Sequence, residues 1–149
     1  MKKLAYASVS FAAALTTMPA SAVRAEQQCY PAPRFKILAT EVIDRKTGLT
    51  WQRGMAPVKK TWAEAKAYCP MVGANFRLPS VKEILTILDV TQSYGIDLVA
   101  FPGTPHSQFW TSSAAAGTAL DAWVGSFGSS GGGATTRAVS EPLQVRCVR

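Results

Sequence analysis

The stretch that decides the fold is residues 143–149, with the sequence Leu143-Gln144-Val145-Arg146-Cys147-Val148-Arg149. Apolar and polar side chains alternate along most of it, which is the period of a β-strand. The pattern predicts a strand whose apolar face carries Leu143, Val145 and Cys147, and whose other face carries Gln144, Arg146 and Val148. This strand therefore directs a cysteine toward the core.

A second cysteine, Cys69, follows a well-marked helix start. Thr61 precedes Glu64 by three residues, which is the spacing of a capping box: the hydroxyl and the carboxylate satisfy the free amides of the first turn. One face of this helix is formed at positions i, i+3 and i+7 by Trp62, Ala65 and Cys69. We expect Pro70 to end the helix, since its ring removes a helical hydrogen bond.

Both cysteines lie on the apolar face of their own segment, so a bond between Cys69 and Cys147 would tie the middle of the chain to its end. A third cysteine, Cys29, leaves alternatives open. It is a free thiol, a link to another chain or an alternative partner for one of the other two. A disulfide persists in an oxidising compartment. The start of the chain predicts that the protein reaches such a compartment.

Residues 1–22 have the organisation of a secretory signal peptide. A positive start at Lys2 and Lys3 precedes the apolar residues 4–15 and a cleavage site of small residues at 20–22, with 23–25 as a second choice. The apolar run is shorter than the roughly twenty residues that span a bilayer, so we expect cleavage and a secreted or periplasmic protein. We expect a leader at residues 23–40 and a single domain at 41–149.

The domain mixes strand and helix patterns. Residues 42–43 and 49–51 predict a β-hairpin closed at Gly48, after a short strand at 35–38. A second capping box joins Ser80 and Glu83, and its helix has an apolar stripe of Val81, Ile84, Leu85 and Leu88. A loop is expected at 91–108, and further strands at 109–112, 122–127 and 134–139. A second loop at 128–133 separates the last two strands. The order of hairpin, helices and strands predicts an α+β fold with a mainly antiparallel sheet.

Motifs along this domain resemble the Lcl C-terminal domain family, which is named for a bacterial collagen-like adhesin. The matching strings are Val42-Ile43-Asp44, Thr47-Gly48-Leu49-Thr50-Trp51-Gln52, Trp62-Ala63-Glu64-Ala65, Tyr68-Cys69, Arg77-Leu78-Pro79-Ser80, Glu83-Ile84, Phe101-Pro102, Phe109-Trp110-Thr111-Ser112-Ser113 and Val145-Arg146-Cys147-Val148-Arg149. One departure is Phe76, where the family usually has tryptophan. The sequence also lacks the Gly-X-Y stalk of that adhesin.

The resemblance implies a C-type-lectin-like fold, with two short helices on a mainly antiparallel sheet, related in outline to the sulfatase-modifying enzymes. In such folds a helix cysteine pairs with a cysteine of the terminal strand. The resemblance therefore implies a Cys69–Cys147 disulfide and leaves Cys29 unassigned.

Residues for catalysis or metal binding are scarce. His106 is the only histidine, nothing places it beside Cys29, and Ser112 and Ser113 have no activating Asp or Lys at a suitable spacing. The formylglycine-forming relatives use two cysteines near the end of the domain, where this chain has only Cys147. The calcium-binding strings of lectins are replaced by Glu141-Pro142-Leu143 and Trp123-Val124-Gly125. We predict no enzyme activity, no metal and no cofactor.

Binding is the function that remains. A basic surface is predicted from Arg45, Lys46, Arg53, Lys59 and Lys60, and a recognition surface from Tyr94 and Trp123 with the loops at 94–108 and 128–133. The net charge of +7 is spread along the chain rather than concentrated in blocks, which argues against nucleic acid as a partner.

The leading hypothesis is a secreted, non-enzymatic binding or adhesion domain that recognises a glycan or a protein at the cell surface. The first alternative is a structural envelope component, with Cys29 as a possible covalent link to a partner. The second is an enzyme related to the sulfatase-modifying group.

Overall fold

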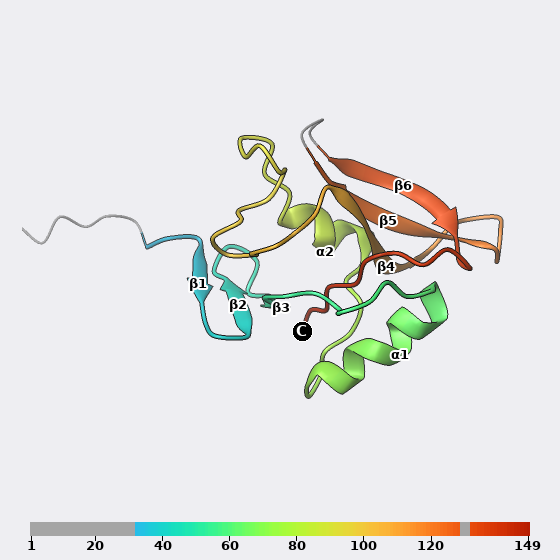
Figure 1. Cartoon of the computed structure of the whole chain (residues 1–149), viewed down its shortest axis with the longest axis horizontal. Helices are drawn as coiled ribbons and strands as arrows, with labels where there is room; N and C mark the ends of the chain where they lie inside the picture. Colours follow the sequence, from blue (N-terminus) through green and yellow to red (C-terminus); the bar gives the residue numbers. More distant parts are fainter. Residues whose placement is uncertain (1–31, 129–131) are drawn as a thin grey trace, which may run out of the picture. The chain divides into compact units, whose positions relative to one another are not determined.

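A computed structural model describes residues 32–128 and 132–149 (Figure 1). The predicted signal peptide, Cys29 and the leader up to residue 31 lie outside the described residues. The elements in chain order are β1 (Phe35–Ile37), β2 (Glu41–Asp44), β3 (Thr50–Gln52), α1 (Trp62–Val72), α2 (Val81–Thr86), β4 (Ser107–Ala114), β5 (Asp121–Phe127) and β6 (Gly133–Ala138). Within the described ranges, no helix is long and apolar enough to cross a bilayer.

The first sheet has the order β1-β2-β3, and all its pairs are antiparallel. β2 and β3 form the predicted hairpin, in which Val42 lies opposite Trp51. Gly48 closes the turn with a φ of 76°, a backbone conformation that favours glycine. The buried carboxylate of Asp44 accepts hydrogen bonds from the backbone N–H of Lys46 and the hydroxyl of Thr47. These contacts fix the turn, and the hairpin prediction is confirmed.

The second sheet has the order β4-β5-β6 and is also antiparallel. Helix α2 lies against one face of this sheet (Figure 1). The approach is close because β5 carries Gly125 at the contact: a Cβ there would lie 2.6 Å from Cγ2 of Ile84. Two antiparallel sheets with two helices make an α+β fold, as the sequence predicts.

Helix α1 begins at the predicted capping box, with Thr61 as its N-cap and the Glu64 carboxylate accepting from the Thr61 N–H at 2.8 Å. The predicted end was wrong, because the helix continues through Pro70 to Val72. Proline removes one N–H, and in the last turn of a helix this costs a single hydrogen bond. The predicted inner face is correct, since Ala65 and Cys69 are buried.

Helix α2 is shorter than its apolar stripe. Ser80 caps it by accepting the Glu83 N–H at 3.2 Å, and the helix ends at Thr86. The amides of Ile87 and Leu88 then donate to the carbonyls of Ile84 and Leu85, three residues back. The stripe therefore continues as a tighter turn that keeps Ile84 and Ile87 in the core.

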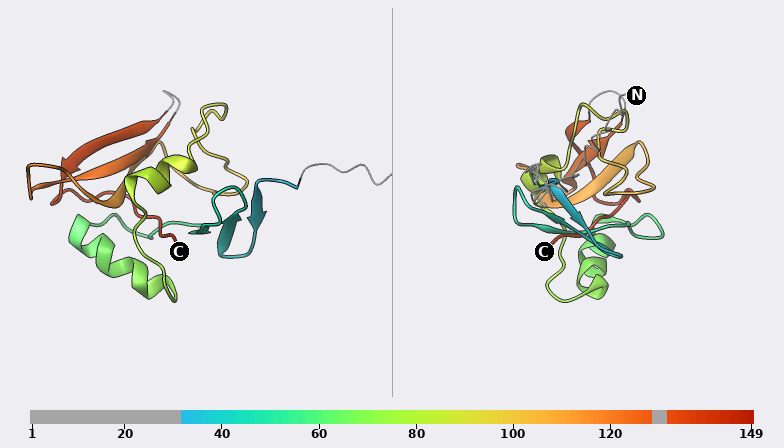
Figure 2. Two further views of the ribbon diagram at one scale, coloured as in Figure 1. Left: turned by 180° about the vertical axis from the view of Figure 1, so that it is seen from behind. Right: turned by 90° about the vertical axis from the view of Figure 1, so that its left-hand side faces the viewer.

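Residues 143–149 form no named strand, yet they are hydrogen-bonded along both edges. On one edge the carbonyls of Arg149, Cys147 and Val145 accept from the backbone of residues 50, 52 and 56. On the other edge, Gln144 pairs with residues 108 and 110, and Val148 pairs with Arg77. The views in Figure 2 show this red segment running between the two sheets. We refer to it as the terminal segment.

The structure agrees with the predicted alternation, since Val145 and Cys147 lie in one core cluster and Val148 lies in the other. Because chain segments cover the terminal segment on both sides, Arg146 and Val148 are also 0% exposed. Cys147 lies on the other face and is bonded to Cys69, with 5.5 Å between their Cα atoms. The implied disulfide is confirmed. It anchors α1 to the terminal segment in a core cluster that also contains Trp110 and Val145.

Candidate functional site

A hollow of about 440 Å³ opens where the chain enters β4 and leaves β5. Its lining comes from both strand ends and the terminal segment: His106, Ser107, Gln108, Ser126, Phe127, Gly128, Gly132 and Leu143. We call it the β4–β5 hollow. Polar and apolar surfaces both contribute to its wall, which suits a ligand that carries hydroxyl groups on a carbon skeleton.

Two loops meet beside the hollow. The backbone at Gly95 lies close to that at Gly128, so that a Cβ added at Gly95 would be 3.1 Å from the Gly128 nitrogen. Tyr94, on the same loop, contacts the His106 ring edge-to-face, with 4.2 Å between ring centroids. The two loops expected to form a recognition surface thus come together over the residues that the structure describes, and residues 129–131 lie outside them.

One cation stands at the edge of the hollow. The Arg137 Nε on β6 donates to the Gln108 Oε1 on β4 at 2.7 Å, and no carboxylate pairs with Arg137 in the described ranges. Ser126 adds a hydroxyl that donates to the Gly133 carbonyl at 3.3 Å. The site therefore combines donors, acceptors, an oriented guanidinium and an aromatic pair, an arrangement suited to binding a polar ligand.

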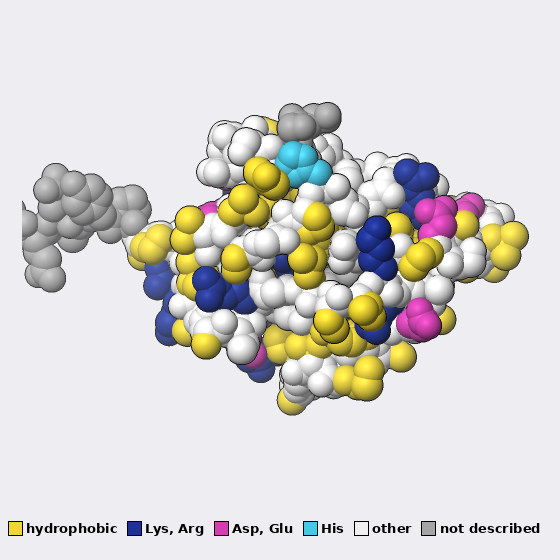
Figure 3. All heavy atoms as spheres, viewed as in Figure 1, with side chains coloured by type: hydrophobic (Ala, Val, Ile, Leu, Met, Phe, Trp, Pro, Cys, Tyr) yellow, Lys and Arg dark blue, Asp and Glu magenta, His cyan; other side chains and the backbone are white. Residues whose placement is uncertain are grey.

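The predicted basic surface is not one cluster. Arg45 and Lys46 lie at the β2–β3 turn, and Lys59 and Lys60 precede α1 at the opposite end of the domain (Figure 1). Arg45 donates to the Pro33 carbonyl at 2.8 Å, and the Lys60 ammonium lies 5.0 Å from the Tyr68 ring. Figure 3 shows basic side chains in separate places on this face.

The aromatic candidates are also divided. Tyr94 is 40% exposed and reaches the hollow through His106. Trp123 is 36% exposed and lies on β5 two residues from Gly125, hence on the α2 side of the sheet. Trp123 is not part of the hollow lining. Arg53 follows β3, and its Nε is buried without a hydrogen-bond partner.

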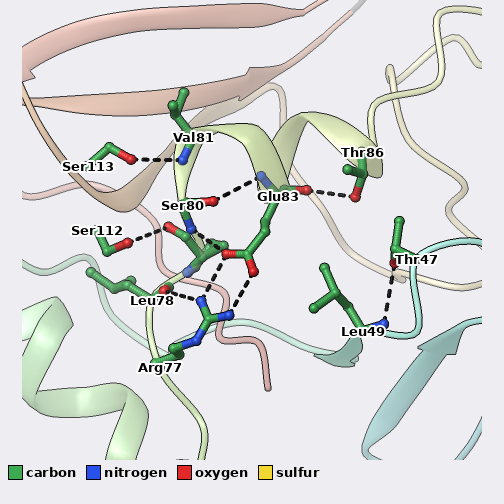
Figure 4. Close-up of polar contacts among 11 residues, drawn as sticks. Thr47, Leu49, Arg77, Leu78, Ser80, Val81, Glu83, Thr86, Ser112 and Ser113 are labelled. Atoms are coloured by element: carbon green, nitrogen blue, oxygen red, sulfur yellow. Dashed lines mark hydrogen bonds and ion pairs between the residues drawn. The ribbon is translucent and has the colours of Figure 1, made fainter.

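The serines considered as nucleophiles have structural roles at a junction between α2 and β4 (Figure 4). The Ser112 hydroxyl donates to the Pro79 carbonyl at 3.3 Å, and the Ser113 hydroxyl accepts the Val81 N–H at 3.1 Å. Arg77 donates to both carboxylate oxygens of Glu83, at 2.7 and 2.9 Å. This bidentate contact, with the Ser80 N–H, lowers the pKa of Glu83 to about 2.

His106 contacts the Tyr94 ring, and Cys29, which the sequence did not place beside it, lies outside the described residues. Among residues 32–128 and 132–149, no three His, Cys, Asp or Glu side chains lie close enough to hold a metal ion. Sequence reasoning missed two features of this region. Gln108 and Arg137 are 29 positions apart and meet only through the fold, and the complete burial of the charged Arg146 has no signal in the sequence.

The fold and the site define an α+β domain with a hollow of mixed polarity beside its second sheet. The sequence pattern of the Lcl C-terminal domain matches residues 40–149, and the chain belongs to that family. No curated protein matches the sequence. Among solved structures, the chain is similar to EMS16, an antagonist of collagen receptor integrin alpha2beta1 (GPIa/IIa). The TM-score is 0.46 with 9% sequence identity, over 77% of this chain and 95% of that chain.

Proposed function

We propose that this protein is a secreted or periplasmic, non-enzymatic binding domain that recognises a glycan at the cell surface through the β4–β5 hollow. The observation that carries the proposal is the lining of that hollow, which sets hydroxyl and amide groups beside the Tyr94–His106 pair and the Arg137 guanidinium. Sugars offer many hydroxyls and an apolar ring face, and both find partners there.

Two further features support the proposal. The disulfide is suited to an oxidising compartment outside the cytoplasm. The hydroxyls of Ser112 and Ser113 are engaged with the backbone of the segment that leads into α2, so they serve its attachment rather than a reaction. A binding role needs no chemistry beyond the groups at the hollow.

The test is an array of cell-surface glycans and surface proteins probed with the exported chain and two variants. Arg137→Gln removes the cation of the hollow, and Lys82→Gln removes one charge from exposed α2 as a matched control. We expect glycan binding to weaken about tenfold in Arg137→Gln, the effect of one lost charge-assisted hydrogen bond, and to persist in Lys82→Gln. Equal binding by all three chains, or capture of surface proteins alone, would contradict the proposal.

A further inference from the structure

The terminal segment covers one edge of each sheet and leaves the other edge open. It pairs with β3 of the first sheet and with Gln108 and Trp110 of β4 in the second. The outer strands are therefore β1 and β6, and β6 forms the border of the second sheet in Figure 1. An open edge carries backbone N–H and C=O groups that can pair with another strand.

The two outer strands differ in the protection of their edges. β1 has three residues, with the exposed Lys36 at its centre, and both short length and lysine discourage pairing at an edge. β6 has six residues, which pair with β5 in an unbroken register and include no proline. Its four central residues, 134–137, are all exposed. The β6 edge is thus the longer and less protected of the two.

Alternate residues of β6 direct their backbone groups away from the sheet. Just after the strand, the Val139 N–H donates to the Leu120 carbonyl, in the same register as the β5–β6 pairs. Because hydrogen-bonded positions alternate in an antiparallel pair, residues 133, 135 and 137 face β5, and residues 134, 136 and 138 face outward. The backbone groups of Ala134 and Thr136 have no other partner among the described residues.

The one charged side chain of β6 does not block this edge. The Arg137 Nε donates to the Gln108 Oε1 at 2.7 Å. Because Gln108 lies on β4, on the far side of β5, this bond draws the guanidinium back across the sheet. The outward edge of β6 is therefore uncharged.

From these features we propose that β6 pairs antiparallel with β6 of a second copy of this chain, with the two-fold axis at Thr136. In this register Ala134 lies opposite the partner's Ala138, and Arg137 lies opposite the partner's Thr135. No like charges face each other, and two β-branched threonines meet at the axis. The strand is therefore complementary to itself in charge, in backbone groups and in side-chain size.

The pairing also accounts for the position of Trp123, which does not line the β4–β5 hollow. Trp123 lies opposite Thr136 in the β5–β6 register, so the tryptophans of both copies fall in one row across the joined sheet. A single pair of six-residue strands is small beside the roughly 1,200–2,000 Å² of stable interfaces. We therefore expect a reversible dimer, and its formation does not depend on a glycan.

The experiment is sedimentation equilibrium of the exported chain, with Cys29→Ser in every sample so that a disulfide-linked dimer is not counted. We expect a monomer–dimer equilibrium below about 1 mM chain. Thr136→Pro removes an outward N–H, which an edge strand tolerates. It should weaken the dimer about tenfold or more, because the axis loses two symmetric hydrogen bonds. Thr136→Val keeps the N–H and is the matched control that should still dimerise.

An exchange of charge tests the second copy and the register together. Thr136→Lys and Thr136→Glu each set like charges opposite each other at the axis, and each should weaken self-association about fivefold. An equimolar mixture of the two should associate more strongly than either alone. The proposal is overturned by a Thr136 chain that stays monomeric up to about 1 mM, by equal dimers in Thr136→Pro and Thr136→Val, or by a mixture that gains nothing.

Discussion

Arg77 and Arg146 carry the same guanidinium group in two opposite environments. Arg77 is clasped by both oxygens of Glu83, and this contact raises its pKa. Arg146 has two neutral acceptors, an unpaired Nη1 and a pKa lowered to about 9 by burial. Both are attached to the terminal segment, one by backbone pairing with Val148 and one by belonging to it.

The difference shows which parts of the molecule have all their charges and hydrogen-bond donors paired. The junction of Arg77, Ser80 and Glu83 satisfies its own charges and fixes the start of α2 (Figure 4). Arg146 is buried, and its Nη1 has no hydrogen-bond partner among the described residues. The same side-chain group is thus fully paired in one place and partly paired in the other.

The largest expected effect comes from releasing the terminal segment, which both arginines share. The double variant Cys69→Ser with Cys147→Ser should lose about 2–5 kcal/mol of unfolding free energy, as small exported domains do without a native disulfide. Urea unfolding followed by tryptophan fluorescence measures the change. An unchanged midpoint would mean that the hydrogen bonds at both edges hold the segment without the Cys69–Cys147 bond.

The ion pair between Arg77 and Glu83 predicts that the unfolding free energy depends on pH in the acid range. The pKa of Glu83 is lowered from 4.5 to about 2, so its stabilisation is complete above pH 4.5 and is lost as the pH falls toward 2. Because Arg77 is half exposed, we expect about 1–2 kcal/mol rather than the full value of the shift. Glu83→Gln should remove this amount at neutral pH and should converge with the wild type in acid.

Urea midpoints measured across that pH range test the Glu83 prediction, and Glu64→Gln is the matched control. Glu64 occupies the same position in the capping box of α1 but is exposed and has no arginine partner. Its substitution should have the smaller effect. Parallel pH curves for wild type and Glu83→Gln would show that the ion pair contributes nothing to stability.

Replacing the partly paired Arg146 should change the unfolding free energy little, although the side chain is large and buried. Arg146→Met should stay within about 1 kcal/mol of the wild type, because the lost contacts are offset by relief of an uncompensated buried charge. Denaturant unfolding tests this, with Arg77→Met as the partner variant that breaks a satisfied pair. A loss for Arg146→Met as large as that from emptying a packed core site would show that Arg146 is already compensated.

The smallest effect on the unfolding free energy is expected at Lys82, which makes no hydrogen bond to Arg77 or Arg146. Lys82 is exposed on α2 and makes no hydrogen bond or ion pair with the described residues. Lys82→Gln should change the unfolding free energy by no more than about 0.5 kcal/mol. A larger change measured by thermal unfolding would disqualify it as the charge control for Arg137.

Local signals in the sequence predicted the parts that depend on near neighbours. Both capping boxes and the hairpin turn at Gly48 follow from residues three or four apart, and all are present. The end of α1 was missed because proline rules describe a helix interior, whereas Pro70 lies in the last turn. The Cys69–Cys147 bond followed from a family resemblance, since alternation and helix faces alone left Cys29 as a partner.

Features that depend on distant segments were not predictable. Alternation places Arg146 on the face opposite Cys147, but it does not reveal that other chain segments cover that face too. Beside the β4–β5 hollow, the fold brings Gln108 to Arg137 and Gly95 to Gly128. The spacing of residues along the sequence does not predict such long-range contacts.

The terminal segment also dictates the order of folding. Its hydrogen bonds reach back to residues 50–60, to Arg77 and to residues 108–110, so the contacts that join the two sheets are among the most distant in the chain. Such non-local topology makes folding slow. The contacts that join the two sheets therefore form late in folding, after each sheet has paired its own neighbouring strands.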